Sequence, residues 1–303
     1  MHIAAIIITY YPTEILLRRL LLSVCNEAGR VYIVDNTPAE DINWMSSDWL
    51  LSERFDANYQ SLGDNLGIAK AQNEGIAAAI KDGCDHVIFF DQDSAPPQGM
   101  VQRLLAAELK LLAANIKVGS VGPLFLDEKT KHYARAIRHQ GLKLHKVEIS
   151  SDETEPVAAD YLIASGSLIR VSVLQEAGLM REELFIDWVD IEWGLRAASF
   201  GCKHFIVPDA VMLHSIGDEF VTIGKTPINL HNDVRNYYIV RNACFLLLDR
   251  SVNWQWRFNI LFKIPKYVIF YSLTSLSKNR MQAFMLLLRA CFDGFSGRLG
   301  KAF

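Results

Sequence analysis

The stretch that decides the fold is His86-Val87-Ile88-Phe89-Phe90-Asp91-Gln92-Asp93-Ser94. Its mostly apolar first half predicts a buried strand, and two carboxylates one residue apart follow at the strand's end. Side chains alternate along an extended chain, so Asp91 and Asp93 are expected to point the same way. Two hard oxygen ligands suit Mg²⁺ or Mn²⁺ carrying phosphates. An isolated Asp-x-Asp is more often a solvated turn, so the interpretation depends on the rest of the chain.

Composition narrows the class of protein. The chain has 303 residues, half of them hydrophobic, which allows one large domain or two ordinary ones. A net charge of -3 argues against a whole-protein nucleic-acid binder. The five cysteines are odd in number and lack C-x-x-C spacing, so neither a disulfide framework nor a zinc site is expected. Reduced thiols and the lack of a leader pattern after Met1 favour a cytoplasmic protein.

Strand and helix patterns alternate over the first 120 residues, which predicts a mostly parallel, Rossmann-like α/β sheet flanked by helices. The expected strands are 3–9, 31–34, 55–60 and 86–90, and the expected helices are 13–25, 67–81 and 100–114. Ligands of such sheets bind at the carboxyl ends of the strands. The pairs Thr9-Tyr10 and Asp35-Asn36 follow strand ends, as Asp91-Gln92-Asp93 does. We therefore expect all three to meet at one edge.

The second half has a less regular pattern. We expect a strand at 118–126, a hairpin or loop at 129–147, a strand at 158–170 interrupted by Ser165-Gly166-Ser167, helices at 173–177 and 185–200, and a last strand at 204–207. The remainder, from 228 onwards, is predicted to be helical. These patterns divide the chain into a domain of residues 1–220, with halves 1–115 and 116–220, and a helical region of residues 221–303.

A helix start at Asn65-Leu66-Gly67-Ile68-Ala69-Lys70-Ala71-Gln72-Asn73 offers a phosphate site. Asn65 can cap the helix, and Gly67 would let a ligand approach backbone N–H groups. Helix N-termini favour phosphate. Alone, this segment is more simply an ordinary capped, Ala-rich helix.

Taken together, these segments resemble the family 2 glycosyltransferases, which have the GT-A fold. The matching residues are Ile7-Ile8-Thr9-Tyr10, Val34-Asp35-Asn36, Asn65 to Asn73, and the Asp91-Gln92-Asp93 form of the Asp-x-Asp motif. Further on, Ala164-Ser165-Gly166-Ser167 and Phe185 to Arg196 look like the acceptor-side loop and acidic helix start. His214-Ser215-Ile216-Gly217-Asp218 fits the family's late metal-binding histidine. The resemblance covers roughly residues 3–220.

The resemblance implies a role for each group of residues. Asp91, Asp93 and His214 would hold Mg²⁺ or Mn²⁺, which neutralises the departing diphosphate. The donor nucleotide sugar would contact the strand-end and helix-start residues, which are Thr9, Tyr10, Asp35, Asn36, Asn65, Gly67, Asn73, Asp91 and Gln92. The acceptor would contact Ser165, Gly166, Asp187, Trp188, Glu192 and Trp193.

The resemblance also implies the catalytic base. An attacking hydroxyl must lose its proton to a positioned carboxylate. Asp190 matches the family's base, with Asp187 and Glu192 as rivals. The family usually carries Glu-Asp where this chain has Val189-Asp190, so one carboxylate is missing. A single base with direct attack implies inversion, because retention would need a nucleophile on the opposite sugar face.

Three segments are similar to the rhamnosyltransferase branch of this family, namely Phe89-Phe90-Asp91-Gln92-Asp93-Ser94, Asp187-x-Val189-Asp190-x-Glu192-Trp193 and His214-Ser215-Ile216-Gly217. This similarity implies dTDP-L-rhamnose as donor and a saccharide acceptor, lipid-linked as in bacterial surface polysaccharide or O-antigen assembly. A UDP-sugar donor and a non-catalytic nucleotide- or glycan-binding homologue remain alternatives. A Rossmann dehydrogenase is disfavoured because no G-x-G-x-x-G follows the first strand.

Residues 251–303 carry eight basic residues against the acid Asp293, a net +7 that leaves -10 for residues 1–250. Pro265, Lys263 and Lys266 interrupt the apolar run before it reaches the length of a membrane span. Basic, aromatic-rich helices suit a membrane surface. We therefore expect a peripheral protein at the inner face of the cell membrane, although packing on the sheet or a homo-oligomer interface would also use such helices.

Overall fold

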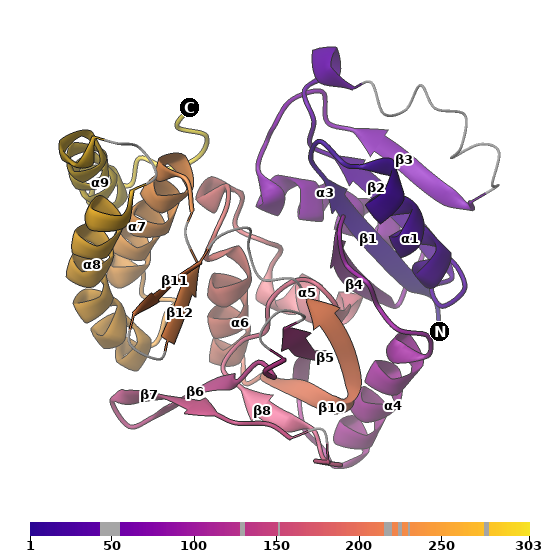
Figure 1. Cartoon of the computed structure of the whole chain (residues 1–303). Helices are drawn as coiled ribbons and strands as arrows, with labels where there is room; N and C mark the ends of the chain where they lie inside the picture. The colour runs from indigo at the N-terminus through magenta and orange to yellow at the C-terminus, as the bar shows by residue number, and fades with distance from the viewer. Residues whose placement is uncertain are drawn as a thin grey trace.

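The computed structural model describes residues 1–42, 55–127, 131–150, 152–214, 220–223, 226–229, 231–275 and 279–303. For residues 214, 220–223 and 226–229 it describes the backbone alone. A large twisted sheet carries helices on both faces, and a group of long helices stands beside it (Figure 1).

The main sheet has eight strands among the described residues, in the order β3-β2-β1-β4-β9-β5-β10-β8. These strands are β1 (Ile3–Thr9), β2 (Arg30–Asp35), β3 (Ala57–Ser61), β4 (His86–Asp91), β5 (Val118–Asp127), β8 (Val157–Ala159), β9 (Leu168–Arg170) and β10 (Lys203–His214). Strands β8 and β9 run antiparallel to their partners, and the other pairings are parallel. The predicted mostly parallel sheet is confirmed.

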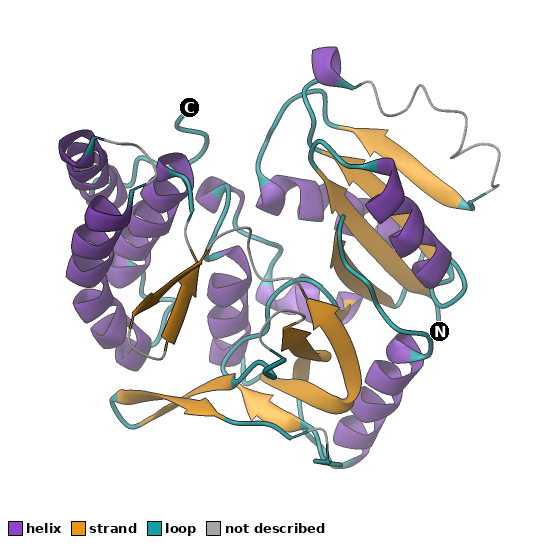
Figure 2. Cartoon of the chain, viewed as in Figure 1, coloured by secondary structure: helices purple, strands orange, loops and turns teal. Residues whose placement is uncertain are grey.

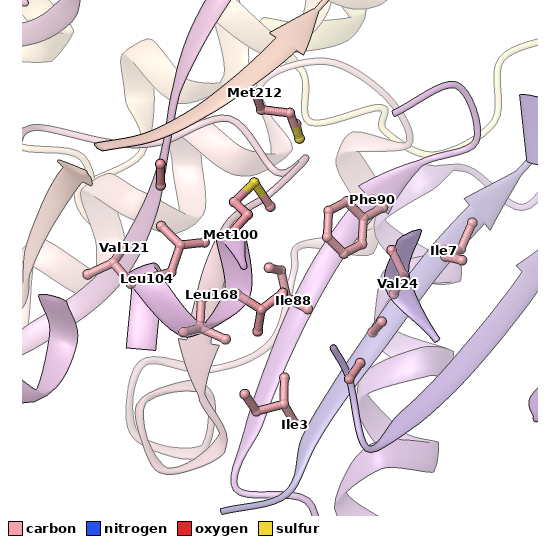
Figure 3. Packing of buried hydrophobic residues seen from close by; sticks show 14 of the residues in the cluster. Ile3, Ile7, Val24, Ile88, Phe90, Met100, Leu104, Val121, Leu168 and Met212 are labelled. Atoms are coloured by element: carbon pink, nitrogen blue, oxygen red, sulfur yellow. The ribbon is translucent and has the colours of Figure 1, made fainter. Parts of the chain in front are cut away.

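Helices cover both faces of this sheet (Figure 2). Helices α1 (Glu14–Val24) and α4 (Met100–Ala113) pack on one face, and α3 (Ile68–Lys81), α5 (Val171–Ala177) and α6 (Val189–Ser199) pack on the other. Because side chains alternate along a strand, β1 fills both cores: Ile3 and Ile7 enter the first, and Ile6 enters the second. Figure 3 shows Ile7, Ile88 and Phe90 in the first core.

The remaining elements lie beside the sheet. A hairpin of β6 (Ala136–Gln140) and β7 (Lys143–Val147) confirms the hairpin expected within 129–147, of which residues 129 and 130 lie outside the described residues. A second antiparallel pair joins β11 (Phe220–Ile223) and β12 (Thr226–Asn229). Helices α7 (Asp233–Leu248), α8 (Trp254–Thr274) and α9 (Arg280–Phe295) pack together. Two short 3₁₀ turns, η1 (Ala39–Asp41) and η3 (Glu182–Leu184), complete the described elements.

Several sequence predictions are corrected by this arrangement. Residues 158–170 do not form one interrupted strand, because β8 pairs with β10 while β9 lies between β4 and β5. The strand expected at 204–207 extends from Lys203 to His214. The helix expected from Phe185 begins only at Val189, because the residues before it have positive φ.

In the helical region, Pro265 lies inside the continuous helix α8. Among the described residues, no helix is long and apolar enough to cross a membrane. The proposed domain boundary after residue 220 falls inside β11 and stays a prediction, and the region predicted to be helical from there begins with β11 and β12, not with a helix. Helices α7 to α9 share a core with Phe185 and Trp188, so this region packs directly against the acceptor-side segment.

Candidate active site

The carboxyl ends of β1, β2 and β4 bring the predicted donor residues to one edge. In the sheet register Thr9 lies beside Asp35, and Ile8 lies beside Asp91. The Thr9 hydroxyl donates to Asp35 Oδ1 over 2.9 Å. The N–H of Tyr10 donates to Gln92 Oε1 over 2.8 Å, which links the ends of β1 and β4. The three strand ends therefore form one polar edge, as the sequence predicts.

Asp35 is fully buried within this edge. Besides Thr9, its carboxylate accepts the N–H and hydroxyl of Thr37, at 3.1 and 2.7 Å, and the hydroxyl of Tyr59 at 3.0 Å. Burial and the neighbouring Asp35 raise the pKa of Tyr59, so this hydroxyl remains a donor. In the structure Asp35 holds the strand ends together, and its direct contact with a nucleotide stays a prediction.

The Asp-x-Asp motif forms a turn. Strand β4 ends at Asp91, and the N–H of Ser94 donates to the carbonyl of Asp91 over 3.0 Å. The strand alternation used to align the two carboxylates therefore stops before Asp93. Asp91 is partly buried and Asp93 is exposed, while Arg19 Nη2 donates to the Asp93 carbonyl over 3.0 Å.

The carboxylates of this turn fit a divalent ion in chemical type. Ala95 pairs with Leu213 in an isolated bridge, so the backbone of His214 lies next to the segment that follows Asp93. The His214 side chain and residues 215–218 of its motif lie outside the described residues. Among the described residues, no group of three or more His, Cys, Asp or Glu side chains is placed to hold a metal. Metal ligation by Asp91, Asp93 and His214 stays a prediction.

The expected phosphate helix α3 begins at Ile68, and Gly67 is its N-cap. Asn65 Oδ1 accepts from the N–H of Gly67 over 3.1 Å, so Asn65 closes the turn and leaves the helix itself without a side-chain cap. Gly67 has φ +91°, and a Cβ there would lie 2.6 Å from Phe185 Cδ2. The Ile68 N–H donates to the carbonyl of Phe185 over 2.8 Å. Glycine is needed at this position to let Phe185 approach.

Asn73 also contacts the acceptor-side chain. Its side-chain amide exchanges two hydrogen bonds of 2.9 Å with the backbone of Met180 and donates to Glu182 over 2.9 Å. Asn36 is nearly buried, and its Oδ1 accepts from the N–H of Leu66 over 2.8 Å. The contacts of Gly67 and Asn73 thus join α3 to residues 180–185, and donor binding by these two residues stays a prediction.

The segment before α6 has an unusual backbone. Phe185, Asp187 and Trp188 have φ values of 65°, 60° and 66°. Such angles are costly for side chains with a Cβ and persist only where surrounding contacts fix them. The Asn242 amide on α7 donates to the carbonyls of Leu184, Ile186 and Asp187 over 2.9 to 3.0 Å. Helix α7 therefore holds the acceptor-side backbone in place.

Arg235, at the start of α7, was not predicted as a site residue. Its guanidinium donates to both carboxylate oxygens of Asp187 over 3.0 to 3.2 Å. Burial lowers the pKa of Arg235, but Asp187 and, to a smaller extent, Asp91 raise it more. The mixture of Asn, Arg and Tyr at the start of α7 was visible in the sequence, but nothing there indicated that Arg235 reaches Asp187.

Asp190 lies in the first turn of α6 and is partly buried. Burial raises its pKa to about 6, the charge of Asp187 adds to this, and hydrogen bonds from the N–H groups of Ile191 and Ala164 oppose it. With Ala164 and Gln72 it lines a cavity of about 10 Å³, and the buried Gln72 Oε1 has no hydrogen-bond partner. A carboxylate with a pKa near neutrality is suited to accept a proton.

The predicted acceptor loop lies against the end of β4. The N–H of Gly166 donates to the carbonyl of Phe89 over 2.7 Å, and the hydroxyls of Ser165 and Ser94 are 2.7 Å apart. Since Ala164 also contacts Asp190, this loop joins the carboxylates at the end of β4 to the proposed base.

The two carboxylates that rival Asp190 as the base, Asp187 and Glu192, each pair with an arginine. Asp187 is held by Arg235, and the fully buried Glu192 pairs with Arg196 at 2.8 Å. Trp188 and Trp193 are buried, and their indole N–H groups donate to backbone carbonyls. Glu192, Trp188 and Trp193 are therefore held by contacts within the protein, and their contact with the acceptor stays a prediction. Asp190 differs in accepting hydrogen bonds from backbone N–H groups.

The comparisons with known proteins agree with this geometry. A sequence model described as "Glycosyl transferase family 2" matches residues 5–178. The chain therefore belongs to glycosyl transferase family 2. It is 34% identical over 305 residues to "dTDP-rhamnosyl transferase RfbF" of Shigella flexneri, a match that covers 99% of this chain and 97% of the relative. The chain is thus rhamnosyltransferase-like over its whole length.

Two solved structures are similar in fold. TarS 1–349 of S. aureus in complex with UDP-GlcNAc matches with a TM-score of 0.60 and 13% identity, covering 98% of this chain and 82% of TarS. GalNAc-T7 with UDP, GalNAc and Mn²⁺ matches with a TM-score of 0.58 and 12% identity, covering 92% of this chain but only 58% of GalNAc-T7. At such identities these matches speak for the fold alone, and they confirm the predicted GT-A architecture.

Proposed function

We propose that this protein transfers L-rhamnose from dTDP-L-rhamnose to a saccharide acceptor with inversion at the anomeric carbon. The observation that supports this most is the 34% identity, over 99% of the chain, to a protein named as a dTDP-rhamnosyl transferase. The acceptor is proposed to be a lipid-linked saccharide of bacterial surface polysaccharide or O-antigen synthesis. The reaction would take place in the cytoplasm, at the inner face of the membrane.

In the proposed reaction Asp190 takes the proton of the attacking acceptor hydroxyl. The hydroxyl oxygen forms a bond to the anomeric carbon while the bond from that carbon to the diphosphate oxygen breaks, and dTDP leaves. The raised pKa of Asp190, about 6, supports this role because the group is mostly ionised at neutral pH yet basic enough to accept a proton. Base catalysis of this kind contributes roughly 10²–10⁴-fold to the rate.

The diphosphate would be bound at the edge formed by β1, β2 and β4. Mg²⁺ or Mn²⁺ held by Asp91, Asp93 and His214 would supply charge neutralisation to the leaving diphosphate. Asp35 and Gln92 contribute by fixing the strand ends that surround this position. Arg235 adds a cation whose pKa Asp91 helps to raise, so it carries positive charge toward the same edge.

A direct test compares donors with the purified full-length protein. In the presence of Mn²⁺ or Mg²⁺, release of dTDP from dTDP-L-rhamnose should exceed release of UDP from UDP-sugars when a polyprenyl-diphosphate-linked saccharide is the acceptor. The product linkage, read by NMR, should have the anomeric configuration opposite to that of the donor. If the protein turns over UDP-sugars and not dTDP-L-rhamnose, the donor is a UDP-sugar. If it binds nucleotide but turns over no donor, it is a non-catalytic homologue.

A further inference from the structure

Helix α8 exposes large apolar side chains along one whole face. At spacings of three and four residues this face carries Trp254, Phe258, Leu261, Phe262, Ile269 and Leu273, all exposed. The opposite face, which includes Trp256, Ile260 and Ile264, is buried against the rest of the helical group. A helix that is apolar on both sides is normally enclosed on both sides.

Helix α9 repeats this arrangement. Its exposed apolar side chains are Met281, Phe284, Met285, Leu288, Phe292 and Phe295. Its other face, with Leu287 and Ala290, packs into the core that α7 and α8 share. Both helices pack on α7 and on each other, at the outer edge of the molecule in Figure 1. Exposed apolar surface on two adjoining helices marks an interaction surface, because soluble surfaces rarely expose large contiguous apolar patches.

The charges on these helices indicate which kind of partner covers the exposed apolar face. The exposed charged residues of α8 and α9 and of the chain directly after α9 are basic, namely Lys266, Arg280, Arg289 and Arg298, whereas Lys301 pairs with Asp64 over 2.8 Å. The acid of this region, Asp293, is buried and accepts from the Tyr237 hydroxyl over 2.7 Å. A second copy of the chain would bring like charges together across a two-fold axis. An anionic lipid surface matches both the apolar face and the basic residues.

We propose that the exposed face of α8 and α9 docks on an anionic membrane and thereby orients the active site toward it. Helix α7 joins the two, because it packs on α8 and α9 while its residues Arg235 and Asn242 hold the segment that contains Asp187. The acceptor-side backbone is thus attached to the docking helices. The orienting role rests on the proposed function with a lipid-linked acceptor, whereas docking itself does not.

The experiment measures co-sedimentation of the full-length protein with vesicles of phosphatidylcholine plus phosphatidylglycerol, and with vesicles of phosphatidylcholine alone. Wild type should bind the anionic vesicles more tightly. The double variant Phe262→Glu/Ile269→Glu places two charges in the proposed lipid contact and should weaken binding at least about tenfold. The matched control Ile15→Glu/Leu22→Glu changes two apolar residues on α1 that are also exposed, and it should bind as wild type does.

Binding of dTDP with Mn²⁺, measured by titration, separates this proposal from the proposed function. Retained dTDP binding by the Phe262/Ile269 variant would show that it is folded and that only docking is lost. Unaltered vesicle binding by that variant would overturn the proposal. A second result would also overturn it. In this result wild type is a dimer in light scattering and does not bind vesicles, and the Phe262/Ile269 variant is a monomer, since the face would then join two copies. Failure of dTDP binding alone would reject the donor site and leave docking standing.

Discussion

The donor edge and the acceptor side of this site are built in different ways. The donor edge uses strand ends within the first 93 residues, where the buried Asp35 is satisfied by hydroxyl and backbone donors. The acceptor side combines residues 164–190 with α7, and it contains an arginine–carboxylate pair and three non-glycine residues with positive φ. A regular sheet therefore preforms one region, while the other depends on contacts with a distant part of the chain.

The largest effect is expected from a substitution of Asp190, which should impair catalysis and leave the donor edge intact. Asp190→Asn removes the proton acceptor and should lower kcat by about 10²–10⁴-fold. Its affinity for dTDP, measured by titration, should stay close to wild type because the donor edge is unchanged. Asp209→Asn, at an exposed position on β10, is the control and should keep full activity. Wild-type turnover by Asp190→Asn would move the base to another residue.

The pH profile tests the same residue without a substitution. Because a base acts in its ionised form, and Asp190 has a pKa of about 6, kcat/KM should fall about tenfold per unit as pH drops below that value. Affinity for dTDP should change much less between pH 6 and 7. An acid limb near the ordinary aspartate pKa would show that burial does not act on this group as proposed.

Arg235 should affect the acceptor side through Asp187. Arg235→Ala leaves the Asp187 charge uncompensated next to Asp190, so the pKa of Asp190 and the acid limb of the profile should both move upward. Arg235→Lys, which keeps the charge, should restore much of the shift. Arg250→Ala, an exposed arginine just after α7, should leave the profile as in wild type. A fall in activity with no movement of the acid limb would indicate a purely structural role.

The smallest expected effect concerns the contact that joins the two regions. Gly67→Ala combines positive φ with a clash against Phe185, whereas Gly83→Ala, at φ +72°, has open space around the new methyl group. Both should destabilise the fold through backbone strain, but Gly67→Ala should cost about 1–3 kcal/mol more because of overpacking. Chemical denaturation measures the difference. Equal losses in the two variants would mean that the backbone yields at Gly67 and that the contact with Phe185 is not tight.

Much of the donor edge could be predicted from the sequence because its determinants are local. Buried strands such as Val31–Val34 end in polar residues, and parallel strands bring those ends to one edge. Strand alternation carries no information where the chain leaves the strand, as at Asp93, because a turn follows Asp91.

The acceptor side was less predictable because its determinants are far apart in the chain. The pairing of Arg235 with Asp187 spans 48 residues, and the positive φ of Trp188 follows from contacts with α7 that no local pattern encodes. The acidic and aromatic residues at the start of α6 indicated ligand contact, but Glu192 and Trp193 are buried and make contacts within the protein. Residue type alone did not distinguish these roles.

The most direct test of the account is one titration of dTDP, with and without Mn²⁺, into wild type, Asp93→Asn and Asp190→Asn. We expect Mn²⁺ to tighten dTDP binding to wild type and to Asp190→Asn alike, and to have little effect on Asp93→Asn, whose weaker site lacks a carboxylate ligand. The account would be contradicted if Mn²⁺ strengthened dTDP binding equally in all three proteins, or if wild type bound no dTDP at all.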